Sequence, residues 1–100
     1  PADIRLMTCV QPFVGVAPVN LVYVADYSRM AEAEEQDRIF YSAADTGCIS
    51  QNVYLYCASE NLATVVRGLV PRSALAKLMK LRRNQHVILA QSVGYPAGAR

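Results

Sequence analysis

Residues 43–70 carry an unusual apolar pattern. A helix in a soluble protein normally has one apolar stripe. Here apolar side chains fall on most sides of a helix drawn over the segment, namely Ile49, Val53, Leu55, Tyr56, Cys57, Ala58 and Leu62. The pattern predicts one mostly buried helix from Ser42 to about Glu60, at the centre of a layered domain. Leu55 is then a packed core residue, and its replacement by alanine should be costly.

The helix has recognisable end signals. Ser42 and Asp45 have the spacing of a capping box at its start. Asn61 follows it, and asparagine ranks after glycine as a left-handed C-cap. Residues 65–68 are then expected to form a short extended segment beside the core, where backbone groups can grip a ligand.

Two apolar runs have the length and composition of strands. They are Asn20–Ala25 and His86–Val93. The first is nearly apolar throughout, so both of its faces should be covered. An acidic helix is expected over Ser28–Gln36, and another helix is expected to begin with Pro71 at its first position. These elements sum to an α/β or α+β layer, with a long helix packed on a small sheet, and we expect the α+β class.

Composition limits the classes of function. One hundred residues form a single domain, 1–100. The hydrophobic fraction of 53% exceeds the usual value of about 45–50%, so we expect an oligomer. A net charge of +2 does not favour nucleic acid, and the basic cluster over residues 77–83 suits a solvated helix end. No apolar run approaches the roughly 20 residues of a membrane span.

Cysteine usage indicates a reducing compartment. Cys9, Cys48 and Cys57 are odd in number and include no CxxC pair. This argues against a disulfide framework and against a zinc site. We interpret all three as reduced packing residues, which predicts a cytoplasmic protein without a metal.

Spacing alone yields no catalytic residues. His86 is the single histidine, and no phosphate-binding glycine motif is present. Asp45 and Glu60 would lie roughly 22 Å apart on one helix, too far for a carboxylate pair. Pro1 offers a remote alternative, a tautomerase that uses a terminal proline amine as base, but Ala2–Met7 do not look like that family's first strand.

Four ordered segments carry a resemblance to a known family. They are Ala17–Asp26, Ser50–Leu55, Leu62–Gly68 and Val93–Pro96. Together they resemble the C-terminal half of the nitroreductase family, whose members use flavin mononucleotide (FMN). The similarity extends from Asp3 to Ala97. It implies a truncated nitroreductase-like domain with a mixed sheet, and a homodimer formed through the helix at 43–60 with Tyr54 and Tyr56 as anchors.

The resemblance also implies where a flavin would bind. In the family, the peptide that matches Val65, Val66, Arg67, Gly68 and Leu69 runs along one face of the flavin ring. Its backbone donors reach the region of the ring nitrogen N5. Arg100 is the one candidate for the basic residue that contacts the flavin phosphate. NAD(P)H would supply electrons to a small-molecule acceptor such as a nitroaromatic compound or a quinone.

Two departures from the family leave alternatives open. Asn61 replaces the usual glycine, and no Arg- and Ser-containing phosphate-binding segment precedes Asp3. If the 100 residues are the whole protein, flavin binding should be weak. One hypothesis is therefore an FMN-dependent NAD(P)H oxidoreductase, or a half-length remnant that is catalytically incomplete. The alternative is a non-enzymatic oligomeric domain that has lost the cofactor and binds a small ligand in the vacated groove.

Overall fold

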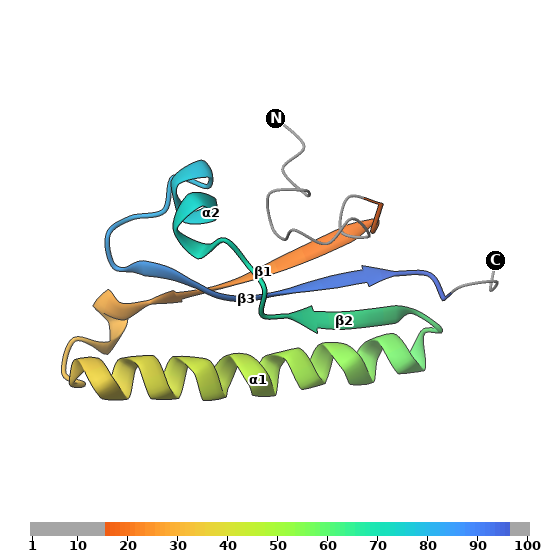
Figure 1. The fold of residues 1–100 in the computed structure, drawn as a ribbon. Coiled ribbons are helices and arrows are strands. Elements are labelled where there is room, and N and C mark those ends of the chain that lie inside the picture. The colour runs from red at the N-terminus through yellow and green to blue at the C-terminus, as the bar shows by residue number, and fades with distance from the viewer. Residues whose placement is uncertain (1–15, 97–100) are drawn as a thin grey trace.

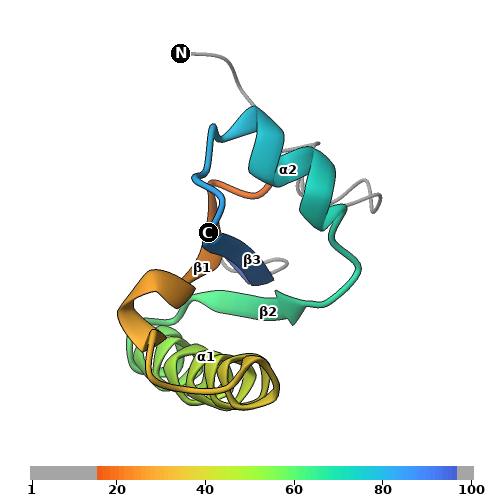
Figure 2. The ribbon, with the colours of Figure 1, turned by 90° about the vertical axis from the view of Figure 1, so that its left-hand side faces the viewer.

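Three strands form a sheet with a helix on each face. The computed structural model describes residues 16–96, and its elements in chain order are β1 (Val19–Asp26), α1 (Glu35–Ser59), β2 (Ala63–Arg67), α2 (Arg72–Leu78) and β3 (Gln85–Gly94). The strand order is β1-β3-β2, so the last strand in the chain lies in the middle. α1 runs along one face and α2 covers part of the other (Figures 1 and 2). The predicted α+β class is confirmed.

The sheet of the described residues is antiparallel throughout, which corrects the expected mixed sheet. β1 and β2 both pair with β3 in the antiparallel sense. They therefore run parallel to each other, but β3 separates them and no parallel ladder forms. Both predicted strands are confirmed, each slightly longer than expected.

β3 contains an irregularity opposite β1. Tyr23 pairs with Leu89 whereas Val24 pairs with Val87, so Ile88 is an extra residue without a partner on β1. Such a bulge shifts the alternation of side chains along a strand. Val87 and Ala90 consequently join the same small core beneath α2, together with Val70 and Leu75.

α1 begins well before the predicted start. Ser42 lies within the helix and donates its hydroxyl to the carbonyl of Ile39 at 3.2 Å, so the predicted capping box is wrong. The helix expected over 28–36 is also wrong. Asp26 instead accepts the backbone N–H of Ser28 at 3.0 Å and caps a single 3-10 turn, Tyr27–Met30. Serine and aspartate side chains often compete in this way for nearby backbone groups.

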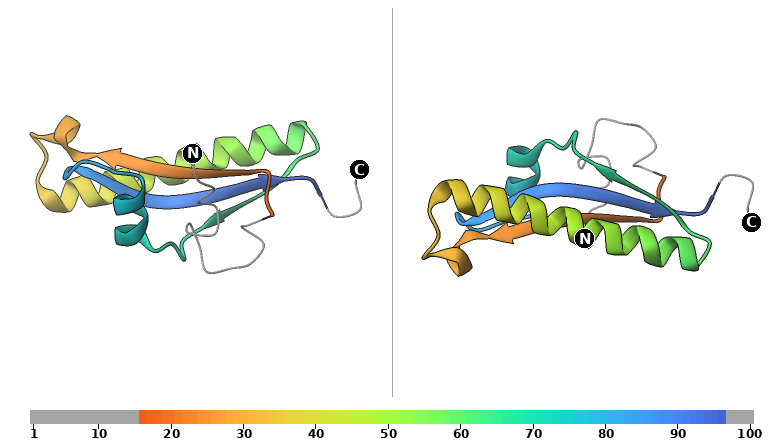
Figure 3. Two further views of the ribbon diagram at one scale, coloured as in Figure 1. Left: turned by 90° about the horizontal axis from the view of Figure 1, so that it is seen from above. Right: turned by 90° about the horizontal axis from the view of Figure 1, so that it is seen from below.

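The prediction that α1 is mostly buried is wrong for the chain by itself. Small residues face the sheet, namely Ser42, Thr46, Ser50 and Cys57. Large apolar residues are exposed instead, namely Ile39, Phe40, Tyr41, Ile49, Leu55 and Tyr56. Leu55 is 59% exposed. Thr46 donates its hydroxyl to the Ser42 carbonyl at 2.7 Å, and such bonds let hydroxyl residues occupy the buried side of a helix. Figure 3 shows α1 lying along the sheet.

The ends of the helices largely follow their sequence signals. Asn61 has a φ of 56°, as its predicted C-cap role requires. Pro71 lies immediately before α2, one position earlier than predicted, which is within the usual uncertainty of a helix boundary. Leu75 is only 1% exposed and forms the centre of the α2 core. The basic residues after it, such as Lys80, are exposed, as expected for a solvated helix end.

Candidate functional site

The predicted flavin-facing peptide, Val65–Leu69, spans the end of edge strand β2 and the turn toward α2. Val65 and Val66 pair with Ser92 and Gln91 of the central strand. Gly68 and Leu69 lie beyond the ladder, and both are exposed. The fold therefore holds one end of the peptide on the sheet and presents the other end to a ligand.

A side chain from α1 attaches to the outer edge of β2. The backbone N–H of Val66 donates to the hydroxyl of Tyr54 at 2.8 Å. Tyr54 is thus half-buried against the sheet, and its role as a dimer anchor stays a prediction. Tyr56, the other expected anchor, is 62% exposed. The Val66 amide already has a protein acceptor, so it is not available to a ligand.

Two neighbouring backbone donors remain. Within residues 16–96, the N–H groups of Gly68 and Leu69 donate to no protein acceptor. The Gly68 carbonyl has two donors, the Val70 N–H at 2.9 Å and the Arg72 guanidinium at 3.1 Å. This end of the peptide can therefore offer hydrogen-bond donors to an electron-rich ligand edge.

Gly68 leaves open space for a close approach. A Cβ atom built at this position would meet only the Cδ2 atom of Leu89, at an ordinary 3.9 Å. The fold itself therefore does not need a glycine here for packing. A planar ligand lying on the backbone would gain from the missing side chain.

The side chain of Arg67 has a different role from its backbone. It is only 3% exposed. Its Nε donates to the Ser92 hydroxyl at 2.9 Å, and its Nη2 donates to the Asn20 side-chain oxygen at 3.1 Å. The Ser92 hydroxyl donates to the same oxygen at 2.5 Å. The guanidinium thus links all three strands, and only the Arg67 backbone can contribute to a flavin-facing surface.

A second polar network lies between the sheet and α1. The Tyr23 hydroxyl donates to Gln91 at 2.5 Å, and the Gln91 amide donates to Thr64 at 3.0 Å. Burial raises the pKa of Tyr23, and the nearby thiol of Cys57 raises it further. Tyr23 therefore stays a neutral donor at neutral pH, as its bond to the Gln91 carbonyl oxygen requires.

One groove adjoins the peptide, and a second lies farther along β3. One, of about 410 Å³, is lined by Val65, Ser92, Gly94 and Tyr95 among others. The other, of about 500 Å³, lies between β3 and the first half of α1 and includes Arg72 and His86. His86 stacks on Tyr27 with ring centroids 4.3 Å apart. His86 is exposed.

Sequence reasoning missed Tyr54 and Arg72, which contact the peptide. Tyr54 lies on α1, twelve residues before Val66, and contacts it only because the helix packs beside the strand. No local spacing marks such a contact. Arg72 is four residues after Gly68, and its bond depends on the turn between them. Arg100 lies outside the described residues.

Other site classes find no support between residues 16 and 96. There, no group of three or more His, Cys, Asp or Glu side chains could hold a metal ion. No helix in this part of the chain is long and apolar enough to cross a membrane.

Comparison with known proteins assigns the chain to a family. The sequence profile of the nitroreductase family matches residues 3–95, so the chain belongs to this family. A nitroreductase-like protein of Methanocaldococcus jannaschii is 27% identical over 92 residues. That alignment covers 92% of this chain and 46% of the relative. The chain therefore spans about half the length of the curated relative it matches.

Solved structures agree with the family. A nitroreductase-like structure from Ralstonia eutropha JMP134 has a TM-score of 0.89 and 46% identity, over 97% of this chain and 46% of its own. The NADPH:FMN oxidoreductase of Vibrio harveyi, solved with NAD⁺, has a TM-score of 0.77 and 26% identity. That match covers 87% of this chain and 41% of the enzyme. The predicted nitroreductase-like half domain is confirmed.

Proposed function

We propose that this chain forms the ring-facing half of an FMN-dependent NAD(P)H oxidoreductase, with Val65–Leu69 lying against the flavin. One observation carries the proposal. The exposed Gly68–Leu69 turn has two backbone N–H groups without protein acceptors, beside a glycine that packing does not require.

The family supports the identity of the ligand. The Vibrio harveyi relative is an NADPH:FMN oxidoreductase, and in the nitroreductase family the matching peptide runs along one face of the flavin ring. FMN, when bound, supplies hydride transfer from a nicotinamide to a small acceptor such as a nitroaromatic compound or a quinone. The residues of this chain would orient the ring by backbone hydrogen bonds and shield one of its faces. The phosphate contact from Arg100 and the cytoplasmic location remain predictions.

Gly68→Ala should weaken FMN binding without harming the fold. The added methyl group projects into space that a flavin resting on the backbone would occupy. We expect the dissociation constant to rise about tenfold or more, which corresponds to roughly 1.4 kcal/mol or more. Quenching of FMN fluorescence during titration measures the constant, and thermal unfolding without FMN measures the fold.

Lys77→Ala is the control for that experiment. Lys77 is exposed on α2 and lies outside both the Val65–Leu69 peptide and α1. This variant should bind FMN like the unmodified protein. Equal FMN affinity in Gly68→Ala would place the ring elsewhere. Absence of FMN binding by the unmodified protein would favour the alternative, a domain that has lost its cofactor.

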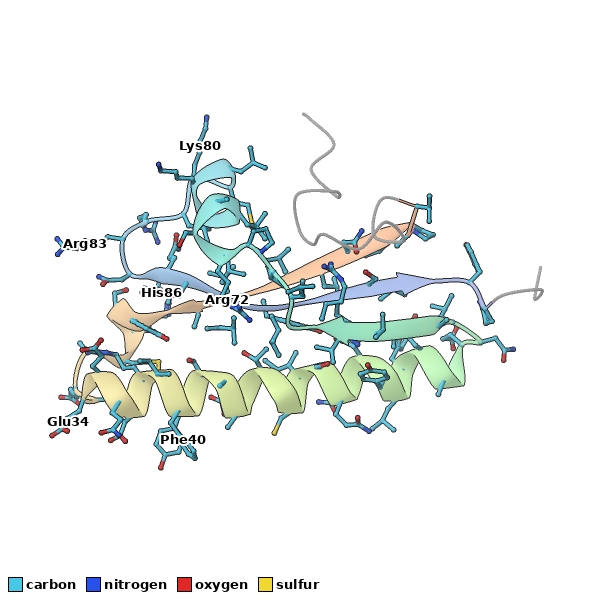
Figure 4. All side chains as sticks on the ribbon, viewed as in Figure 1. Glu34, Phe40, Arg72, Lys80, Arg83 and His86 are labelled. Carbon is cyan, nitrogen blue, oxygen red and sulfur yellow. The ribbon has the colours of Figure 1, made fainter. Side chains whose placement is uncertain are left out.

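We also propose that the protein is a homodimer or higher oligomer joined through the outward side of α1. Large apolar residues of α1 are exposed, and Figure 4 shows Phe40 pointing away from the sheet. An exposed surface of this kind usually marks an interaction site. The family supports the same surface, since its long helix builds the dimer interface and the flavin is touched by both subunits.

Leu55→Ala should therefore weaken association more than folding. Leu55 is 59% exposed in the single chain, so its loss should change monomer stability by less than about 1 kcal/mol. Dimer dissociation should increase about tenfold if Leu55 lies within the interface. Sedimentation over a range of concentrations gives the constant. Lys77→Ala, on the opposite side of the sheet, should leave association unchanged, and a purely monomeric protein at micromolar concentration would contradict the proposal.

A further inference from the structure

We propose that Arg72 is a positioning residue that fixes the direction of the Leu69 N–H, and so prepares the Gly68–Leu69 turn to receive a ligand. This inference rests on the proposed flavin site for its functional meaning. Its structural part concerns only residues of this chain and can be tested without a flavin.

Arg72 bridges two backbone carbonyls that belong to different segments. Its Nε donates to the carbonyl of Ile88 at 3.0 Å, and its Nη2 donates to the carbonyl of Gly68 at 3.1 Å. Figure 4 shows Arg72 beside β3, below the first turn of α2. Ile88 is the extra residue of the bulge in β3. The bulge thus supplies an anchor on the central strand, and Arg72 ties the turn to it.

Because the peptide unit is planar, holding the Gly68 carbonyl also restrains the N–H group that faces a ligand. The Gly68 carbonyl and the Leu69 N–H belong to one planar trans peptide unit, in which they point in opposite directions. Arg72 and the Val70 N–H hold the carbonyl from one side, the latter at 2.9 Å. The Leu69 N–H must then point away from both donors. Holding the Gly68 carbonyl in place therefore also fixes the direction of the Leu69 N–H, which remains available to a ligand.

The position of Arg72 in α2 has no other evident electrostatic reason. Arg72 is the first residue of the helix, where the helix dipole disfavours a cation. Within residues 16–96 it forms no ion pair with an acidic side chain. The carbonyls of Ile88 and Gly68 instead accept hydrogen bonds from its guanidinium. The forked guanidinium suits two acceptors at once, whereas a lysine ammonium is a single point donor on a flexible stem.

The first experiment compares Arg72→Gln with Arg83→Gln by amide NMR of the flavin-free protein. Both changes remove one exposed positive charge, but Arg83 lies in the loop before β3, away from the turn (Figure 4). In Arg72→Gln we expect hydrogen exchange at the Val70 amide to become about tenfold faster, because its acceptor is no longer held. The Leu69 amide signal should also shift or broaden. Arg83→Gln should leave both signals unchanged, and Arg72→Lys should fall between.

The second experiment measures FMN affinity in the same variants. We expect binding about tenfold weaker in Arg72→Gln and unchanged in Arg83→Gln. Unaltered Val70 exchange and Leu69 signal in Arg72→Gln would overturn the positioning role. Altered NMR signals together with unaltered FMN affinity would overturn its link to the ligand. If the unmodified protein binds no FMN but the NMR changes occur, the proposed function fails while the orientation of the turn by Arg72 stands.

Discussion

Leu75→Ala should be among the most destabilising single changes in this chain. Leu75 lies on the buried side of α2, is 1% exposed and packs against Val70, Val87 and Ala90. Removing a packed leucine side chain loses its transfer free energy and leaves a cavity, which together cost about 2–5 kcal/mol. Small domains have total unfolding free energies of only about 5–15 kcal/mol. Denaturant unfolding followed by circular dichroism should show the loss directly.

Leu78→Ala is the matched control for Leu75→Ala. Leu78 lies on the same short helix but is 44% exposed. Both variants replace leucine by alanine in α2, so the change in helix propensity is the same. Leu78→Ala should cost less than about 1 kcal/mol. Equal losses in the two variants would mean that α2 does not bury Leu75 as described.

Arg67→Ala should produce a comparable loss, even when no flavin is present. Its buried guanidinium donates to Ser92 and to Asn20. Hydrogen bonds to charged groups contribute about 1.5–3 kcal/mol each, so two of them correspond to about 3–6 kcal/mol. The Ser92 and Asn20 oxygens would also lose a buried donor. The unfolding free energy of the flavin-free protein is the quantity to measure.

This result separates two roles for Arg67. If the side chain served only a bound flavin, Arg67→Ala would leave the stability of the flavin-free protein unchanged. Arg83→Ala removes a positive charge at an exposed loop position and serves as the control. It should change the unfolding free energy by close to zero. Arg67→Lys should recover part of the stability, since it restores a cation but not the two-pronged geometry.

The sequence predicted the strands better than it predicted the helix. Asn20–Ala25 and His86–Val93 could be identified because each contains a continuous run of apolar residues of strand length, a pattern that does not depend on the neighbouring elements. The prediction of which side of α1 is buried failed because the sheet-facing residues include Ser42, Thr46 and Ser50, which are polar. The hydroxyls of Ser42 and Thr46 donate to carbonyls within the helix, so these two residues cost little to bury. Counting apolar residues cannot tell which side of a helix faces its own sheet and which faces outward.

The candidate site shows the same division. The extended form of residues 65–67 and the left-handed Asn61 followed from local chemistry. The flavin assignment came only from resemblance. The direction of the Arg67 side chain and the contacts made by Tyr54 and Arg72 depend on how separate elements meet. No local spacing records such meetings, so these features required the structure.

The central place of β3 has a consequence for how the chain can fold. β3 is the one neighbour of both β1 and β2, yet it is the last of the three to be synthesised. Val19 must find Val93 across most of the described chain, and closing long loops of this kind slows folding. During translation, β1 and β2 would leave the ribosome as unpaired strands, accompanied by a helix whose large side chains face outward. The nascent chain would therefore expose unpaired strand edges until β3 emerged, a stage at which chaperones typically intervene.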